Sequence, residues 1–196
     1  MSTNRSGQTT AGKTQGWRDM SPTIRIATTQ DLDMVLTFYH ELCEAVTGTP
    51  SDCYWRRDIH PSDEFLTQLV EDGCMYLVMC GSQLGAAAGI DHDLGHEYEN
   101  VTWQVDVDPQ EAVVIHLLAT HPDHRGLGLA RTLLSRLAED ARAIGAKALR
   151  LDATGNNAPA IALYQSEGFA CVGTGEQDIH PDGEAPVPFV VMERVL

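Results

Sequence analysis

The sequence has few basic residues and no long apolar run. Lys and Arg account for 13 of its 196 residues and Asp and Glu for 28, which gives a formal net charge of −15. Such a field repels nucleic acid and anionic membranes and attracts a cationic molecule such as an amine, although acidity also simply keeps a protein soluble. No stretch approaches the roughly 18 uninterrupted apolar residues of a membrane helix. We therefore expect no nucleic-acid partner and no membrane partner.

Cysteine patterns typical of disulfide frameworks or zinc sites are also missing. The cysteine count is odd, no two cysteines are spaced as CxxC, and no apolar signal segment opens the chain. We therefore expect reduced thiols, no metal site and a cytoplasmic location. The polar first residues, rich in Ser, Thr and Gly, predict a flexible N-terminal arm over residues 1–21, followed by a single domain over residues 22–196.

Hydrophobic periodicity predicts elements in the order β-α-α-β-β-β-β-α-β-α-β-β. The order mixes hairpins with a β-α-β-α-β segment, which favours an α+β fold with a mixed sheet and helices on both faces. The run at 111–120 is almost wholly apolar, so it should be a central strand covered on both sides. The expected helices cover 31–46, 62–73, 127–145 and 158–168, and the expected strands cover 23–27, 74–80, 84–93, 100–107, 111–120, 147–153, 169–175 and 187–196.

A glycine-containing stretch, Arg125-Gly126-Leu127-Gly128-Leu129-Ala130, lies between the apolar strand and an amphipathic helix. The N-terminus of a helix offers unpaired N–H groups and the positive end of its dipole, and glycines let a ligand approach them closely. With Arg125 nearby, the stretch predicts a phosphate or pyrophosphate site. A P-loop would need Gly-Lys-Ser/Thr, and a dinucleotide fingerprint would need a small residue where Arg131 stands.

Two segments together resemble the GNAT N-acetyltransferase superfamily. Arg125-x-x-Gly128-x-Ala130 is similar to its acyl-CoA pyrophosphate loop. Downstream, Leu151-Asp152, Asn157-x-x-Ala160-x-x-Leu163-Tyr164 and Gly168-Phe169 are similar to its asparagine-to-tyrosine segment. The resemblance covers about residues 112 to 172. It implies a GNAT-type fold, with a mostly antiparallel sheet in a three-layer α/β/α arrangement, and an acetyl-CoA-dependent N-acetyltransferase that acts by direct transfer to a primary amine.

The resemblance also implies which residues bind acetyl-CoA. The pantetheine arm would pair with the backbone of Leu118, Ala119 and Thr120, with the Leu118 N–H as the oxyanion donor. Asn157 would contact the cofactor arm, and Tyr164 would lie at the thioester. The backbone groups that would hold the pyrophosphate are those of Arg125, Gly126, Leu127, Gly128, Leu129 and Ala130.

Tyr164 is the general acid that the resemblance implies, whereas the general base stays open. His116 is isolated in an apolar strand, and an imidazole titrates close to neutral pH. It stands two residues from Leu118, so both side chains should point to one face. Asp152, at the end of a strand, is the other candidate. A core histidine and a water chain to solvent are the alternatives.

The alternative function is a non-catalytic acyl-CoA-binding or sensor domain, against which Tyr164 argues. A Cys-His-Asp hydrolase is disfavoured because no nucleophile lies in a recognisable turn. The acceptor stays unassigned among small amines and peptide N-termini, with the acidity favouring a cationic one, and a homodimer stays open. The acidic segment 90–100 is expected to be a solvated loop near the acceptor, and the segment 53–61 either an acceptor wall or a packing patch.

Overall fold

The computed structural model describes residues 21–49, 52–93, 95, 98, 101–177 and 186–196. The predicted N-terminal arm falls almost wholly on residues 1–20 and so lies outside the described residues. Among the described helices, none has the length and apolar character needed to cross a bilayer.

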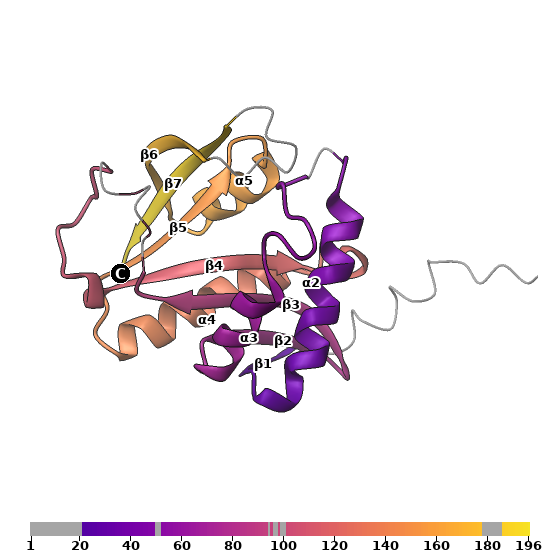
Figure 1. Ribbon diagram of the computed structural model, residues 1–196. Coiled ribbons are helices and arrows are strands. Elements are labelled where there is room, and N and C mark those ends of the chain that lie inside the picture. The colour runs from indigo at the N-terminus through magenta and orange to yellow at the C-terminus, as the bar shows by residue number, and fades with distance from the viewer. Residues whose placement is uncertain (1–20, 50–51, 94, 96–97, 99–100, 178–185) are drawn as a thin grey trace, which may run out of the picture.

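A seven-stranded sheet forms the centre of the molecule (Figure 1). Its strands run in the order β1-β2-β3-β4-β5-β7-β6, and every neighbouring pair is antiparallel except β4 and β5. This mixed, mostly antiparallel sheet confirms the predicted α+β class. The strand bounds are β1 Thr23–Ile26, β2 Met75–Cys80, β3 Gln83–Asp91, β4 Ala112–Thr120, β5 Ala148–Thr154, β6 Ala170–Gln177 and β7 Val187–Val195.

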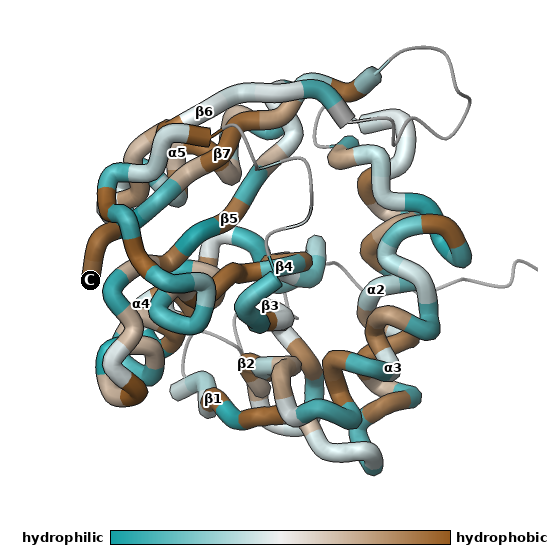
Figure 2. The backbone as a smooth tube through the Cα atoms, turned by 60° about the vertical axis from the view of Figure 1, so that its left-hand side comes forward, coloured by the Kyte–Doolittle hydropathy of each residue, from teal (hydrophilic) through white to brown (hydrophobic). Residues whose placement is uncertain are grey.

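Helices cover both faces of the sheet, as predicted (Figures 1 and 2). Helices α2 (Leu32–Val46) and α3 (Asp63–Glu71) pack on one face, where their apolar residues form one hydrophobic cluster with the sheet, the α2-face cluster. Helices α4 (Leu129–Ala143) and α5 (Ala158–Ser166) contribute to a second cluster on the opposite face, the α4-face cluster. The three-layer α/β/α arrangement is therefore confirmed, with a core on each side of the sheet.

Local sequence signals explain where two of these helices begin and end. The Ser62 hydroxyl accepts a hydrogen bond from the Phe65 N–H at 3.2 Å and so caps the start of α3. Beyond α4, Gly145 adopts a φ of 85°, a left-handed conformation that favours glycine and ends the helix. These are the positions that the sequence predicts for both signals.

The expected strand at 100–107 is absent among the described residues 101–107, which are irregular. Side chains hold this segment in place. The Glu193 carboxylate accepts from the Gln104 N–H at 2.6 Å and from the Arg150 guanidinium at 3.0 Å. Arg150 in turn donates to the Val105 carbonyl at 3.2 Å and lies 3.9 Å above the Trp103 ring. A buried ion pair thus anchors this segment in place of the backbone hydrogen bonds of a strand. The alternation of residues in the sequence could not reveal this ion pair.

A bulge interrupts the regular pairing of β4. The register with β3 shifts between Ala87 and Gly89, so that Leu117 and Leu118 of β4 stand opposite one residue of β3. Leu117 has a φ of 56°. A left-handed conformation costs a residue other than glycine about 1–2 kcal/mol, so surrounding contacts must hold Leu117 there.

The bulge also reverses the alternation of side chains along β4. Ile115 packs in the α4-face cluster, Leu117 in the α2-face cluster, and Leu118 against the α4-face cluster again. His116 contacts the Phe65 ring of α3, with 6.2 Å between ring centroids. The expectation that His116 and Leu118 share a face was wrong, because the bulge inserts one residue into a period of two.

Candidate active site

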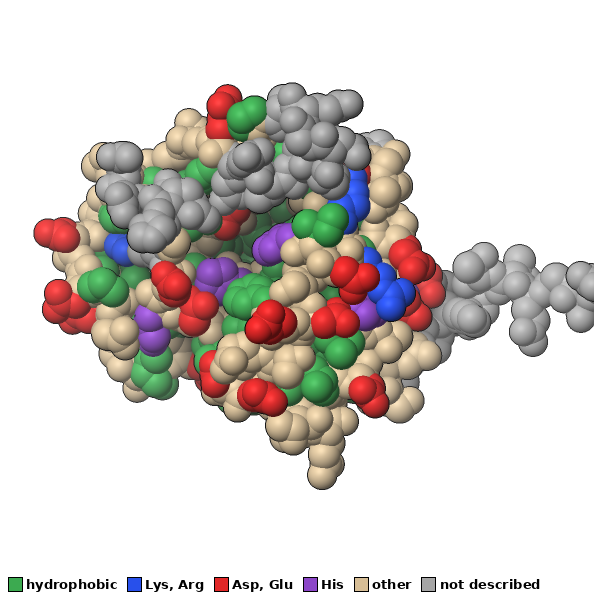
Figure 3. All heavy atoms as spheres, viewed as in Figure 1, with side chains coloured by type: hydrophobic (Ala, Val, Ile, Leu, Met, Phe, Trp, Pro, Cys, Tyr) green, Lys and Arg blue, Asp and Glu red, His purple; other side chains and the backbone are tan. Residues whose placement is uncertain are grey.

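A cleft of about 1270 Å³ opens where β4 and β5 separate. The two strands pair only from Ala112 to Val114, opposite Ala148 to Arg150, and diverge beyond that point. On the face of the molecule drawn in Figure 3, hydrophobic and histidine side chains lie in the hollowed centre, and carboxylates lie around this hollow. The expected site residues that line the cleft are His116, Leu118, Ala119, Thr120, Arg125, Gly126, Gly128, Leu129, Ala130, Asp152, Asn157 and Tyr164.

The cofactor loop, which we define as Arg125–Ala130, borders one end of the cleft. Gly126 and Gly128 have φ values of 78° and 77°, and a Cβ built on either would meet no atom within 4 Å. Gly128 is the residue that precedes α4, so the first N–H groups of a 15-residue helix open beside this empty space. Leu127 differs from its neighbours because it packs against the α4-face cluster instead of lining the cleft.

The start of α5 borders the same cleft. The Asn157 carboxamide oxygen accepts from the Ala160 N–H at 3.3 Å, so this side chain caps α5. Capping uses the oxygen and leaves the amide nitrogen as a donor for a second partner. Arg131, at the start of α4, donates to the Ser166 hydroxyl at 3.0 Å and pairs with Glu167, which ties the two helices together.

Tyr164 lines the cleft from α5, with 6% of its surface exposed. Burial raises the pKa of its hydroxyl well above the ordinary value, and the nearby Asp152 carboxylate and Cys53 thiol raise it further. The hydroxyl therefore stays protonated at neutral pH. Asp152 accepts a hydrogen bond from the Tyr98 hydroxyl at 2.7 Å, so a second tyrosine, besides Tyr164, lies beside this carboxylate.

His116 pairs with a carboxylate that the sequence pattern does not connect to it. Its Nε2 lies 2.7 Å from Asp91 Oδ1, where β3 ends next to β4. An ionised carboxylate only accepts, so Nε2 carries the proton and Nδ1 is the basic atom of the ring. His60 lines the same cleft, and burial, together with the neighbouring His116, lowers the pKa of its imidazole. The cleft therefore contains an oriented imidazole, not an isolated core histidine.

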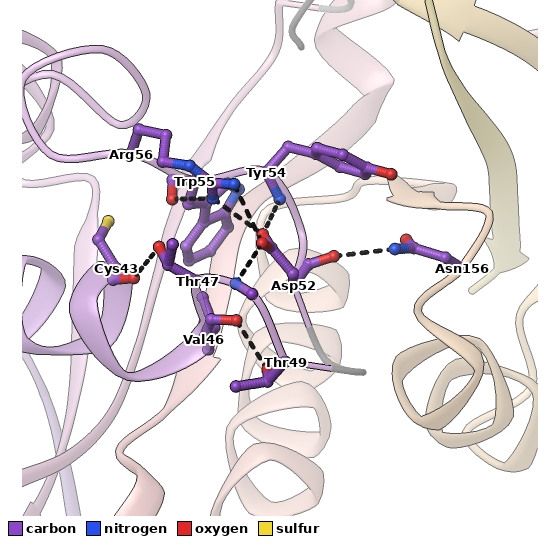
Figure 4. Close-up of polar contacts among 10 residues, drawn as sticks. Cys43, Val46, Thr47, Thr49, Asp52, Tyr54, Trp55, Arg56 and Asn156 are labelled. Atoms are coloured by element: carbon purple, nitrogen blue, oxygen red, sulfur yellow. Dashed lines mark hydrogen bonds and ion pairs between the residues drawn. The ribbon is translucent and has the colours of Figure 1, made fainter. Parts of the chain in front are cut away.

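A loop before α3 forms the N-terminal wall of the cleft through Cys53, Trp55 and His60. The Asp52 carboxylate holds this loop by accepting from the Gly48 and Tyr54 N–H groups and from Arg56 (Figure 4). Burial alone would raise the Asp52 pKa, but these hydrogen bonds outweigh it and lower the pKa overall.

One contact joins the N-terminal wall to a segment 104 positions further along the chain. The Asn156 side-chain amide donates to the Asp52 carbonyl at 3.0 Å, which connects this loop to the turn before α5 (Figure 4). Trp55 lines the cleft and also packs against Tyr39 with the two rings tilted and 6.0 Å between their centroids. The segment 53–61 is therefore both a cleft wall and a packing patch.

Charge is unevenly distributed along the cleft. Arg125 and Arg131 are its lining residues with a permanent positive charge among those the structure describes, and both belong to the cofactor-loop end. Among the described residues, the lining carboxylates are those of Asp91, Asp93, Asp152 and Glu176, which come from the end of β3, the segment just after it, β5 and β6. One end of the cleft thus suits an anion, and the other suits a cation.

A glycine loop at a helix N-terminus, a bulged strand and a buried tyrosine all border one cleft between β4 and β5. The sequence profile of the acetyltransferase (GNAT) family matches residues 40–169, and the chain belongs to that family.

Curated and solved proteins agree with this assignment. An L-amino acid N-acyltransferase of Escherichia coli is 43% identical over 56 residues, which cover 29% of this chain and a third (33%) of that protein. The ribosomal-protein-alanine N-acetyltransferase of Brucella melitensis has the same fold, with a TM-score of 0.66 at 24% identity over 89% of this chain and 99% of that one. A Salmonella typhimurium structure described as a putative acetyltransferase with acetyl-CoA gives a TM-score of 0.66 at 22% identity, over 90% and 94% of the two chains.

Sequence reasoning missed several residues that border the cleft. The sequence places Asp91 in the acidic segment 90–100, which predicts a solvated loop, and parts of that segment lie outside the described residues. Tyr98 belongs to no motif, yet both residues line the cleft. Glu176 lies at the end of β6 and also carried none. The antiparallel pairing of β3 with β4 is the one signal that could have connected Asp91 with His116. Gly89 lies opposite His116, and Asp91 is the diagonal neighbour two residues further along β3, within reach of a long side chain.

Proposed function

We propose that the protein is an acetyl-CoA-dependent N-acetyltransferase that transfers the acetyl group directly to a primary amine. The observation that carries the proposal is the continuous cleft, which runs from the cofactor loop to the buried hydroxyl-bearing Tyr164. Membership of the acetyltransferase (GNAT) family supports the same activity.

The cofactor loop fits the diphosphate of acetyl-CoA. The space beside Gly126 and Gly128 is open to a ligand, and the α4 N-terminus and Arg125 supply N–H donors and positive charge. The thioester would lie along Leu118–Thr120, next to the bulge that interrupts the regular ladder of β3 and β4. When bound, acetyl-CoA supplies an activated acyl group, and the chain supplies its position and the proton transfers.

Direct transfer requires two proton movements that this cleft can provide. The amine nitrogen forms a bond to the acetyl carbon while the carbon–sulfur bond breaks, and Tyr164 donates its proton to the departing sulfur. His116 or Asp152 takes the proton that the amine gives up. The Leu118 N–H stabilises the oxygen as it gains negative charge.

Free CoA release in the presence of a panel of primary amines tests this proposal against a non-catalytic acyl-CoA sensor. The proposed enzyme releases CoA faster when at least one amine is present, and it yields the N-acetylated amine by mass spectrometry. Tight acetyl-CoA binding with no amine-dependent release across the panel would instead support the sensor.

We further propose that the acceptor carries a second positive charge and no free carboxylate. The sequence has no Lys or Arg from Asp58 to His124 or from Leu151 to Glu193, and these two segments supply most of the cleft outside the cofactor loop. Within the described part of the chain, four carboxylates line the cleft there: Asp91, Asp93, Asp152 and Glu176. A carboxylate on the acceptor would meet like charge without a permanent cation to pair with. The E. coli relative is named for L-amino acid acceptors, so this preference would set the present protein apart.

Matched pairs of amines test the acceptor class, because each pair differs by one carboxylate. Agmatine is compared with arginine and cadaverine with lysine, at the same ionic strength. We expect kcat/KM to be at least about tenfold higher for the decarboxylated member of each pair, which corresponds to about 1.4 kcal/mol. Equal values, or a preference for the amino acids, would contradict the proposed acceptor class while leaving the transferase activity intact.

We also propose a cytoplasmic location, which the thiols support. All five cysteines are free, as expected for a reducing compartment.

A further inference from the structure

We propose that Tyr39, a buried residue of α2, is a positioning residue for the reaction. This inference rests on the proposed transferase activity. Tyr39 is 1% exposed, and its hydroxyl donates a hydrogen bond of 2.9 Å to the Leu117 carbonyl oxygen. That carbonyl belongs to the strained residue of the β4 bulge. Neither the cofactor loop nor the asparagine-to-tyrosine segment contains this tyrosine.

The geometry of the peptide bond connects Tyr39 to the oxyanion donor. The Leu117 carbonyl and the Leu118 N–H belong to one planar trans peptide, so they point in opposite directions. A hydroxyl on the α2 side that fixes the carbonyl therefore fixes the N–H toward the opposite side, where Leu118 packs against the α4-face cluster and lines the cleft. Rotation of this peptide would remove the donor without moving either strand.

The hydrogen bond also makes the same N–H a stronger donor. A peptide whose carbonyl accepts a hydrogen bond is more polarised, and in a buried setting the effect extends to its N–H. Tyr39 keeps its proton throughout, because burial raises the pKa of its hydroxyl far above the ordinary value. Its ring packs edge-on against Phe38, with 5.1 Å between centroids, and near Trp55 of the cleft wall, so the hydroxyl is held in place.

Replacing Tyr39 by Phe tests the proposal, because the change removes the hydroxyl and keeps the ring. Tyr76→Phe is the matched control. Tyr76 is 6% exposed and donates to Asp140 at 3.0 Å, on the α4 face and outside the cleft lining. Each variant loses one hydrogen bond from a buried tyrosine, so a stability effect should be similar in the two.

We expect Tyr39→Phe to lower kcat about tenfold, with the Kd for acetyl-CoA within about twofold of wild type, because the lost donor acts on charge that develops during transfer. Tyr76→Phe should keep kcat within about twofold. Saturating acetyl-CoA stabilises the folded state of both variants during the assay. Thermal melts then show whether each variant is folded at the assay temperature. Unchanged kcat in Tyr39→Phe, or equal losses in the two variants, would overturn the proposal.

The backbone amide of Leu118 gives a second readout that does not depend on turnover. In wild type, acetyl-CoA binding should shift the Leu118 ¹H–¹⁵N resonance more than those of its β4 neighbours. In Tyr39→Phe this shift should shrink, and the amide of the free protein should exchange with solvent faster. An identical Leu118 response in both proteins would overturn the role of Tyr39. A wild-type protein that turns over no amine would contradict the proposed function instead, and the amide response would still report on Tyr39.

Discussion

The two ends of the cleft are built in different ways. The cofactor end consists of backbone groups within short stretches of the chain, namely the β4 bulge, the cofactor loop and the α4 N-terminus. The proposed acceptor end consists of side chains from the loop before α3, the end of β3, β5 and β6. Backbone-built sites require glycines and helix starts at fixed spacing, whereas side-chain-built sites accept many residues. Proteins with a cleft of this type are therefore expected to share the cofactor and to differ in the acceptor.

The largest effect should come from the residue at which the two ends meet. Tyr164→Phe removes the proposed general acid, and loss of general acid catalysis lowers kcat about 100-fold or more. The Kd for acetyl-CoA, measured by calorimetry, should stay within about threefold because the ring still fills its buried position. Tyr76→Phe again serves as the control. A Tyr164→Phe enzyme with wild-type kcat would remove the tyrosine from the mechanism.

The second prediction concerns the cofactor end alone. Gly128→Ala places a methyl group where the pyrophosphate would lie, so the KM for acetyl-CoA should rise about tenfold or more while the KM for the acceptor changes little. Gly145→Ala is a close control, because Gly145 has a φ of 85°, open space around its Cβ position and a place at the other end of α4. Both changes should cost about 1 kcal/mol of stability. Equal KM values in the two variants would contradict a pyrophosphate site at Gly128.

The third prediction concerns proton transfer at the acceptor end. The raised pKa of Tyr164 keeps its hydroxyl protonated past pH 10, so kcat should show no alkaline loss from this group up to that pH. On the acid side, kcat/KM should fall as the general base becomes protonated. His116→Gln or Asp152→Asn should change kcat/KM several-fold on the acid side of the pH profile. A profile identical to wild type in both variants would exclude both residues as the base.

The smallest effect should come from charge at the rim. Glu176 lines the cleft but is exposed, so Glu176→Gln should raise the KM for agmatine only about two- to threefold. The effect should diminish at high salt because exposed charges are screened. Glu139→Gln, at an exposed position of α4, should leave this KM unchanged. An agmatine KM that responds equally to both changes would indicate a general field instead of a local one.

The difference between the two ends also explains how much the sequence predicted. The sheet class follows from local patterns, and local motifs that resemble the family point to the cofactor loop, Asn157 and Tyr164, which the structure places along one cleft. Their roles stay predictions. Leu127 was included in the loop, but its position against the core depends on which way the turn faces. The family profile likewise matches the part of the chain that carries these patterns.

Long-range contacts account for what the sequence did not predict. The Tyr39 hydroxyl contacts Leu117 across 78 positions, and Tyr98 reaches Asp152 across 54. The irregular segment at 101–107 depends on Gln104 bonding to Glu193 across 89 positions. The β4 bulge has no glycine to mark it, so strict alternation placed His116 and Leu118 on one face. Periodicity reports local geometry, and these features are set by tertiary packing instead.

Two-substrate initial-rate kinetics test most directly whether one cleft holds the cofactor and the acceptor together. Rates are measured with acetyl-CoA varied at several fixed concentrations of agmatine, or of the best amine in the panel. Direct transfer within a ternary complex predicts double-reciprocal lines that intersect, with no acetylated protein in the intact mass spectrum. Parallel lines together with an acetyl-enzyme of matching mass would contradict the account, because they would show that the two substrates use the site in turn.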